Sequence, residues 1–422
     1  MRDLIINGYL EMPGDITEIK DDAFAKNKEL RHADLSNVRY IGAGAFRECS
    51  NLESVTMSNA VVIGPRAFEF CKSLRSITIG DVTEIGEAAF SFCGMLDVPS
   101  IPRSVTKLGA GAFSHTAIRR VDLNWMGEIP PSILSFCTSL EYADISSARI
   151  IGKDAFAGCV SLSVVRFGPV RKIGARAFHR CGMLEISSLP DTLEEIGDDA
   201  FSLVHDGITV PKSVRSIGKD CFGPIERQKK INIYKSSLHE FRNYFRDDRT
   251  YIDEADHFYL WESAIDVTVL DDQTDNAVGF LPLYSDLNST LREALTGAFR
   301  TDNSFDYSVL DSVLFEGMGW NQRGKDRLAV MRSRHPYELD DSCRAGYIDY
   351  LDKHSRRIAR RAVEDKDVEL LRFMHDNGMF SKDNISGIVD YSISLSASEC
   401  TAFLLECQSE LNGQYDPLLE EL

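Results

Sequence analysis

The twelve residues IGAGAFRECSNL, from Ile41 to Leu52, recur in nearly the same form further along the chain. IGPRAFEFCKSL runs from Ile63 to Leu74, and IGKDAFAGCVSL runs from Ile151 to Leu162. The first two copies begin 22 residues apart. A fixed period of this size is typical of a solenoid built from stacked coils, and it argues against a set of separate active sites.

Phenylalanine marks this period along the first half of the chain. The recurring positions are Phe24, Phe46, Phe68, Phe90, Phe113, Phe156, Phe178, Phe201 and Phe222. Neighbouring positions lie 21 to 23 residues apart, except for one interval of 43 residues in which Leu134 takes the place of Phe. The sequence therefore predicts ten coils of 21 to 23 residues. Because one coil cannot bury its apolar face alone, the coils must stack to share a core.

A short stretch of alternating residues follows the Cys and Leu of each repeat. In Ser54-Val-Thr-Met57, Val55 and Met57 point to one face, while the two polar residues point to the other. This period of two predicts a strand with one buried face. Equivalent strands of successive coils are expected to pair in parallel, about 4.8 Å apart.

A glycine recurs in phase just before the Ala-Phe pair, as Gly42 and Gly64 show. We expect it where the backbone turns sharply or needs a positive φ. The segment after it has the form xxAFxxC, which is the spacing of one short helical turn. If the strand side and the turn side differ in thickness, the stack curves, and the strands should line its concave face.

The motif Ile-Gly-x-x-Ala-Phe-x-x-Cys-x-x-Leu resembles the BspA-type leucine-rich repeat over about residues 16–226. The resemblance implies an α/β solenoid, right-handed, with a parallel β-sheet on its concave face. It also implies a function in binding, often adhesion or contact with proteins, without catalysis. Many members of that family are secreted or anchored at the cell surface.

Six of the ten cysteines occupy one position of the repeat. They are Cys49, Cys71, Cys93, Cys137, Cys159 and Cys181. Two interpretations are open: a metal or redox ladder, or small thiols buried in a tight turn. No CxxC pair with zinc-ligand spacing is present, and Asn27 and Thr116 replace Cys in two coils. We therefore favour buried thiols and expect no metal and no cofactor.

The chain lacks the common catalytic motifs GxxxxGK[ST], HExxH and GxSxG. GAGAF, at Gly42 and Gly109, lacks the third glycine of a dinucleotide-binding loop and belongs to the repeat. His115, His179 and His205 fall in variable turns, where surface positions are expected. The sequence thus predicts a protein that is not an enzyme, with no catalytic residues.

The outward-facing strand residues are the candidate binding residues. Those we single out are His32, Asp34, Arg120, Asp122, Tyr142, Asp144 and Arg166. The same register also turns outward Ser54, Thr56, Ser76, Thr78 and Val164. Because Arg and Tyr are enriched among binding hot spots, we expect a partner between Arg120 and Arg166. The alternative is an ordinary solvated sheet face.

The second half of the chain lacks this period and divides into two further regions. Residues 227–290 predict a capping helix after a last strand, then a small β segment near 258–285. Residues 291–422 predict short antiparallel helices, following the solenoid of residues 1–226. Leu371-Arg-Phe-Met-His and Ala402-Phe-Leu-Leu-Glu align at an offset of 31 residues. This spacing resembles ankyrin-type helical hairpins, which implies a second protein-binding module.

One basic run, KHSRRIARR at residues 353–361, stands among acidic residues. Ion pairs on the helix or with acidic loops are favoured there over a nucleic-acid contact. The net charge of −18 also disfavours nucleic acid as the main partner. The sequence contains no run of 18 apolar residues, so no membrane span is predicted.

These observations predict a non-catalytic scaffold that binds protein partners inside a bacterial cell. The predicted location is cytoplasmic, because the chain starts without the apolar stretch of a signal peptide. The alternative is an exported surface adhesin or carbohydrate-binding protein whose leader has been removed.

Overall fold

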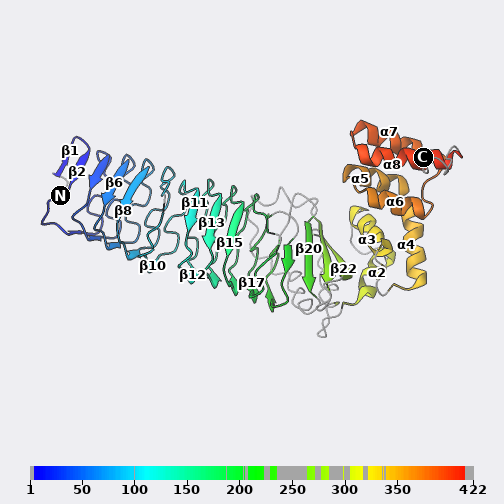
Figure 1. Ribbon diagram of the computed structural model, residues 1–422, viewed down its shortest axis with the longest axis horizontal. Helices are drawn as coiled ribbons and strands as arrows, with labels where there is room; N and C mark the ends of the chain where they lie inside the picture. Colours follow the sequence, from blue (N-terminus) through cyan, green and yellow to red (C-terminus); the bar gives the residue numbers. More distant parts are fainter. Residues whose placement is uncertain are drawn as a thin grey trace, which may run out of the picture. The chain divides into compact units, whose positions relative to one another are not determined.

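The protein is described from a computed structural model, in which the chain forms two compact units. The first unit comprises Met1–Ala277 and Phe299–Ser304, and the second comprises Val278–Ala298 and Phe305–Leu422 (Figure 1). The residues that the structure describes are 4–98, 100–186, 188–202, 204, 208–222, 229–234, 264–270, 277–284, 298, 305–316, 322–334, 336 and 339–413.

Stacked coils build the first unit, and most coils contribute one strand of three or four residues. These long strands are β2 (Tyr9–Glu11), β4 (His32–Asp34), β6 (Ser54–Met57), β8 (Ser76–Ile79), β11 (Arg120–Asp122), β13 (Tyr142–Ile145) and β15 (Val164–Phe167). They pair in parallel as β2-β4-β6-β8 and as β11-β13-β15. This confirms the predicted parallel-strand solenoid. We call the surface formed by their outward side chains the long-strand face.

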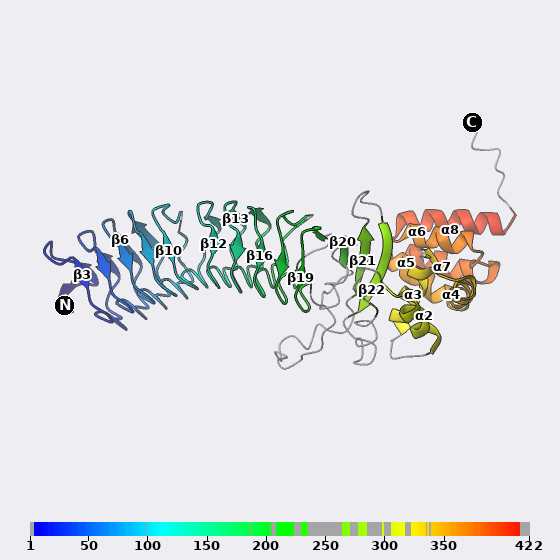
Figure 2. The ribbon, with the colours of Figure 1, turned by 90° about the horizontal axis from the view of Figure 1, so that it is seen from below.

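Each coil also carries a two-residue strand that ends just before the recurring glycine position, at an Ile in every case except Leu108 of β10. These short strands are β3 (Glu18–Ile19), β5 (Tyr40–Ile41), β7 (Val62–Ile63), β9 (Glu84–Ile85), β10 (Lys107–Leu108), β12 (Glu128–Ile129), β14 (Ile150–Ile151), β16 (Lys172–Ile173), β17 (Glu195–Ile196) and β19 (Ser216–Ile217). They form two parallel sheets of five strands (Figure 2). Sequence patterning did not indicate this second ladder, because two residues are too short to display a period.

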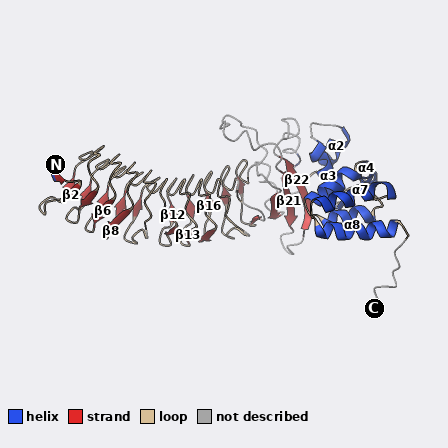
Figure 3. Ribbon diagram, turned by 90° about the horizontal axis from the view of Figure 1, so that it is seen from above, coloured by secondary structure: helices blue, strands red, loops and turns tan. Residues whose placement is uncertain are grey.

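A third row of hydrogen bonds joins the turns that hold the repeated Phe. The Gly44, Phe46 and Glu48 N–H groups donate to carbonyls of the next coil, over 2.9, 2.7 and 2.7 Å. The N–H groups between them bond back within their own turn. Gly44 and Glu48 have φ values of 60° and 59°, so alternate N–H groups face the neighbouring coil. The prediction of a helical turn is therefore wrong. The segment consists of hydrogen-bonded turns that contain left-handed residues, and it is drawn as loop in Figure 3.

The core of the coils is a column of stacked phenylalanine rings. Consecutive rings lie nearly parallel, with centroids 5.1 to 6.1 Å apart. Leu134 interrupts the column between Phe113 and Phe156, and all three side chains are fully buried. Stacked pairs stabilise a fold by about 0.5–1.5 kcal/mol beyond the area that they bury. The predicted role of Phe as the core residue is confirmed.

The recurring glycine has a different cause from the one expected. Gly42, Gly64 and Gly86 do not have positive φ values. A Cβ at Gly86 would lie 2.4 Å from the backbone nitrogen of Pro65 in the preceding coil. Real Cβ atoms do not approach so closely, so close stacking of the coils excludes a side chain here. The left-handed position lies two residues further on, at Gly44 in the second coil and at Arg66 in the third.

An antiparallel hairpin covers the first end of the long-strand sheet. It consists of β1 (Ile5–Ile6) and β2, joined by Asn7 and Gly8. These two residues have φ values of 50° and 81°, as a two-residue type I′ turn requires. Asn-Gly is a strong sequence signal for such a hairpin, so this element was readable from the sequence.

At the other end of the unit, β18 (Ile208–Val210), β20 (Lys229–Tyr234) and β21 (Ala264–Leu270) pair in parallel. β22 (Ala277–Tyr284) follows in the chain. Strands thus occur where a last strand and a small β segment were predicted. The capping helix expected within residues 235–250 lies outside the described residues.

The second unit is helical, as predicted. Its helices are α2 (Tyr307–Glu316), α3 (Gln322–Arg334), α4 (Asp341–Lys353), α5 (Ser355–Glu364), α6 (Val368–Asp376), α7 (Lys382–Ser394) and α8 (Ser398–Leu411). α5 packs on α6 and α7, and α8 packs on α6 and α7, so two hairpins stack (Figures 1 and 2). Lys366 and Ser396, 30 residues apart, occupy the two hairpin turns with φ values of 56° and 54°. The matching turns support the internal repeat.

Ion pairs with buried carboxylates join helices α2 to α5. Arg332 of α3 is fully buried and donates to both carboxylate oxygens of Asp311 on α2, over 2.7 and 2.8 Å. The Tyr347 hydroxyl on α4 donates to the same carboxylate over 2.8 Å. Arg357 of α5 pairs in the same two-pronged way with the buried carboxylate of Asp326 on α3. Tertiary packing therefore brings together charges 21 and 31 residues apart in the chain.

Candidate protein-binding face

Parallel pairing aligns the predicted binding residues in rows across the long-strand face. Arg120 lies beside Tyr142, which lies beside Val164. Asp122 lies beside Asp144, which lies beside Arg166. The predicted register is therefore correct.

Contacts within these rows combine charge with an aromatic ring. The Arg120 guanidinium carbon lies 4.4 Å from the centroid of the Tyr142 ring, a cation–π contact. Arg166 lies 3.4 Å from the Asp144 carboxylate. Arg120 and Arg166 are both exposed, whereas Tyr142 is half-buried. The coils thus hold two guanidinium groups and a phenol ring on a rigid sheet.

Asp144 departs from the expectation of an exposed side chain, because it is only 6% exposed. Burial by itself would raise the pKa of its carboxyl group. Hydrogen bonds from Ser146 and the charge of Arg166 outweigh that effect and lower the pKa. Asp144 is therefore a charged group held beneath Arg166, and it orients that residue more than it offers a contact itself.

The strand aspartates share a structural role. Asp34, Asp122 and Asp144 each accept a hydrogen bond from the N–H two residues further on, over 2.9, 3.0 and 3.0 Å. This is the Asx turn, which ends each strand. The carboxylates are consequently part of the coil as well as part of the face. Arg120, Tyr142 and Arg166 do not form such a turn, and their side chains belong to the face alone.

The first part of the long-strand face is different in character. His32 Nδ1 lies 2.8 Å from Ser54 Oγ, and its neighbours are small hydroxyl side chains. Tyr9 of β2 lies beside His32 in register and is 45% exposed. Tyr9 is not among the predicted binding residues, although the Asn7-Gly8 turn would have placed it on this face.

The long-strand face is divided into two patches, where the sequence suggested one row. No long strand is described between β8 and β11. The intervening coil has two prolines, Pro99 and Pro102, which cannot donate hydrogen bonds to a sheet. The small polar patch on β4–β8 is thereby separated from the Arg–Tyr patch on β11–β15.

A hollow of about 870 Å³ opens beside the short strands at β10 and β12. At this point Pro130 occupies the position of the repeated glycine. In the next coil, the glycine at that position, Gly152, donates its N–H to the Ile129 carbonyl over 2.8 Å. Proline has no N–H, and β10 and β12 belong to separate sheets. Trp125 lines the hollow and donates from its ring nitrogen to the Val105 carbonyl over 3.1 Å.

A second aromatic column runs along the turns, outside the core. Phe70, Phe92, His115 and Phe136 stack with centroids 4.6, 4.0 and 4.8 Å apart. All four residues have left-handed backbones, with φ between 56° and 60°. Burial between the rings lowers the pKa of His115. This histidine is therefore a half-buried stacking residue instead of the surface residue that was expected.

The six repeat cysteines are buried and reduced. Each donates from Sγ to a backbone carbonyl of the preceding coil, as Cys71 does to Phe46 over 3.1 Å. Burial raises the pKa of Cys71 and Cys159 well above the usual value and that of Cys137 to about 11. Such thiols stay neutral and unreactive at neutral pH. Their contacts agree with the interpretation as core residues.

Metal ligation and membrane insertion find no support among the residues that the structure describes. No group of three or more His, Cys, Asp or Glu side chains among them is placed to hold a metal ion. None of the helices described is both long and apolar enough to cross a membrane.

Repeated coils whose strands pair in parallel are the architecture of a leucine-rich repeat solenoid. The family model of the BspA type leucine rich repeat region matches residues 7–97, 61–185 and 171–255. Together these matches cover more than half of the 422 residues. The chain therefore belongs to the BspA type leucine-rich repeat family.

Several solved bacterial leucine-rich repeat proteins are similar to this chain. One from T. pallidum is 27% identical with a TM-score of 0.35, covering 37% of this chain and 78% of that one. A leucine rich cell surface protein from Faecalibacterium prausnitzii is 21% identical with a TM-score of 0.33, covering 55% and 74%. One from Bacteroides ovatus is 24% identical with a TM-score of 0.29, covering 57% and 90%. No curated protein matches the chain.

Proposed function

We propose that the chain is a non-catalytic scaffold that binds a protein partner through the Arg–Tyr patch of the long-strand face. The observation that carries this proposal is the cation–π pair of Arg120 and Tyr142 beside the exposed Arg166. Strand pairing holds these side chains in register, so little conformational entropy is lost when a partner binds. Arg and Tyr are also the residue types most often found at binding hot spots.

The other predicted residues have smaller parts in this proposal. Asp144 orients Arg166, whereas Asp122 lies 3.7 Å from Arg103, outside the Arg–Tyr patch. His32 and Asp34 belong to the polar patch on β4–β8. The helical hairpins of the second unit, which we compare with ankyrin-type repeats, would form a separate binding module. We place the module boundaries at residues 226 and 290.

The test is capture of partners from the native cell with the full chain as bait. The variant Arg120→Ala, Tyr142→Ala and Arg166→Ala should lose a partner that the wild type retains. A matched control replaces Ser54, Ser76 and Thr78, which lie on the same face, by alanine and should retain it. Equal capture by wild type and a correctly folded triple variant of the Arg–Tyr patch would disprove this assignment.

Location is tested separately. A cytoplasmic scaffold should appear in the soluble fraction of the native cell. An exported adhesin or carbohydrate-binding protein would instead appear in the envelope or the medium. Antibody detection after fractionation distinguishes the two.

A further inference from the structure

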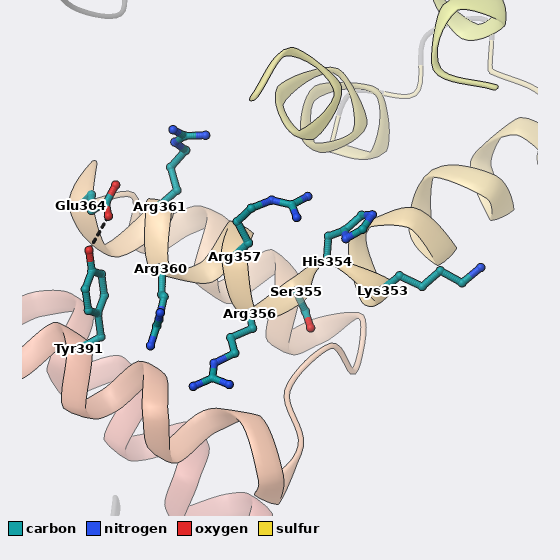
Figure 4. A pocket seen from close by; sticks show the side chains of 9 residues that line it. All are labelled: Lys353, His354, Ser355, Arg356, Arg357, Arg360, Arg361, Glu364 and Tyr391. Atoms are coloured by element: carbon teal, nitrogen blue, oxygen red, sulfur yellow. Dashed lines mark hydrogen bonds between the residues drawn. The ribbon is translucent and has the colours of Figure 1, made fainter. Parts of the chain in front are cut away.

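A basic hollow of about 760 Å³ lies along helix α5 in the second unit. Its lining residues are Lys353, His354, Ser355, Arg356, Arg357, Arg360, Arg361, Glu364 and Tyr391 (Figure 4). Four guanidinium groups come from α5, and one ammonium group comes from the end of α4. We use the name basic hollow for this set of residues.

Two of these five cations are engaged in the fold. Arg357 binds the buried Asp326 carboxylate over 2.7 and 2.9 Å. Lys353 lies 2.6 Å from Asp349, one turn back on α4. By contrast, no carboxylate within the described part of the chain forms an ion pair with Arg356, Arg360 or Arg361. Three guanidinium groups are therefore available to an external anion.

Contacts with α7 hold part of the basic hollow in shape. The Arg360 guanidinium carbon lies 5.0 Å from the centroid of the Tyr391 ring, and the Tyr391 hydroxyl bonds to Glu364. Arg360 Nε is buried, and no residue that the structure describes accepts a hydrogen bond from it. Gly387 of α7 lies beside Arg356, since a Cβ built on it would be 3.4 Å from Arg356 Nη2, an ordinary van der Waals contact. Arg356 and Arg360 both extend toward α7 in Figure 4.

The position of these charges on α5 is unfavourable for the helix itself. α5 begins at Ser355 without a side-chain cap and without an acidic residue in its first turn. The positive end of the helix dipole therefore adds to the charge of Arg356 and Arg357. Arg356 and Arg360, one turn apart on the helix, repel each other. A bound anion would relieve both effects.

Acidic side chains on either side of the basic hollow restrict what kind of anion can enter. Asp349 and Asp352 lie exposed on α4, and Glu364 and Asp365 lie exposed at the end of α5. A long polyanion such as duplex DNA, or an anionic membrane, would meet these carboxylates as well as the arginines. A short segment with a few carboxylates can reach the guanidinium groups alone. Arg also pairs with carboxylates through two parallel hydrogen bonds.

We propose that the basic hollow is a docking site for a short acidic segment of a protein partner, which Arg356, Arg360 and Arg361 bind through its carboxylates. This site belongs to the second unit and is independent of the Arg–Tyr patch. The proposal thus specifies an acidic protein segment as the partner of the helical module.

The test measures binding of a dye-labelled peptide with four consecutive glutamates to the full chain by fluorescence anisotropy. A peptide with four glutamines in their place is the probe control. Wild type should bind the glutamate peptide at least about tenfold more tightly, since one charge-assisted hydrogen bond contributes about 1.5–3 kcal/mol. The double variant Arg356→Gln and Arg361→Gln should lose about tenfold or more of that affinity.

Matched variants separate this site from net charge and from folding. Arg344→Gln with Lys382→Gln removes the same charge at exposed positions and should change the affinity by less than about twofold. Arg356→Lys with Arg361→Lys keeps the charge and should recover part of the affinity. The Arg120, Tyr142 and Arg166 triple variant should bind the peptide like wild type, so failure of one proposal leaves the other intact.

Three results would overturn the proposal. One is equal binding of the glutamate and glutamine peptides by wild type. Another is undiminished binding by the folded Arg356→Gln and Arg361→Gln variant. The third is tighter binding of a DNA duplex or of vesicles with anionic lipid than of the peptide at about 0.15 M salt, where charges more than about 8 Å apart are largely screened.

Discussion

In the repeat coils, the core of each turn is filled by an apolar residue at the same position, Phe in all but the Leu134 coil, whereas helices α2 to α5 are joined by carboxylates and guanidinium groups. In the described part of the first unit, no ion pair has both side chains buried. In the second unit, Arg332 is fully buried with Asp311. The coils therefore depend on shape and stacking, while the helices depend on mutual neutralisation of charge.

This contrast indicates where a single change should be most damaging. In the coils, a large side chain that is removed leaves a cavity, because the neighbouring coils hold the backbone apart. In the helices, the loss of one charge leaves its partner buried without compensation. The following substitutions test the comparison, each through urea unfolding followed by circular dichroism.

The largest effect is expected at the phenylalanine column. Phe90→Ala should lower the free energy of unfolding by about 4 kcal/mol, because the buried ring leaves a cavity between two stacked rings. Phe92→Ala, two residues away in the same turn, should cost about 1 kcal/mol, since this ring is 39% exposed. If Phe90→Ala and Phe92→Ala lower the free energy of unfolding by similar amounts, burial in the column does not explain why Phe recurs at that position.

The next effect is expected at the buried ion pair. Asp311→Ala should cost about 3 kcal/mol, because Arg332 would stay buried without its carboxylate. Replacing both residues, Asp311→Leu with Arg332→Met, should cost clearly less than the single change, since no charge is then buried. If the double variant is less stable than Asp311→Ala, the ion pair itself stabilises the fold. The proposed difference between the helices and the coils would then be wrong.

A smaller effect is expected at the recurring glycine. Gly86→Ala should cost about 2 kcal/mol, because the new Cβ would overlap the backbone of the preceding coil. Gly127→Ala is the control, because nothing lies within 4 Å of a Cβ built there. That control should change the free energy of unfolding by no more than about 0.5 kcal/mol. Tolerance of alanine at Gly86 would show that the coils can separate.

The smallest effect concerns pH. Burial, together with the hydrogen bond to Asp326 and its charge, raises the pKa of Tyr350 to about 12. Because the pKa is higher in the folded state, the unfolded chain loses this proton first, from about pH 10 upward. The stability that Tyr350 contributes is thus complete below pH 10 and is lost as pH rises toward 12. Measured at pH 8, 10 and 11, the free energy of unfolding should fall less with rising pH in Tyr350→Phe than in wild type. An identical fall in the two proteins would argue against the raised pKa.

Much of the coil was predictable because every turn repeats the same environment. Leu52 is fully buried in one coil, and its counterpart 22 residues later, Leu74, is fully buried as well. Period and alternation are therefore sufficient to place Arg120, Tyr142 and Arg166 on one face. The break in that face coincides with a proline in the sequence, Pro102, but its effect on strand pairing becomes clear only in the folded chain.

Other features of the coils depend on distances between neighbouring turns. The recurring glycine is required by the approach of the backbone of the preceding coil, which a single repeat does not display. The left-handed residues serve hydrogen bonds to the next coil. Asp144 is buried because Arg166 and Ser146 close over it, although alternation alone assigns it to the exposed side.

The period, the stacked core and the register of the strands all follow from the amino-acid sequence, because similar residues recur at the same positions in successive repeats. The pairing of charges in the helical unit follows from tertiary packing instead. Asp311 and Asp326 engage Arg332 and Arg357 across different helices, and this leaves Arg356, Arg360 and Arg361 for an external anion. An ion pair depends on a separation of a few ångströms, and without a repeat no spacing along the chain specifies that distance.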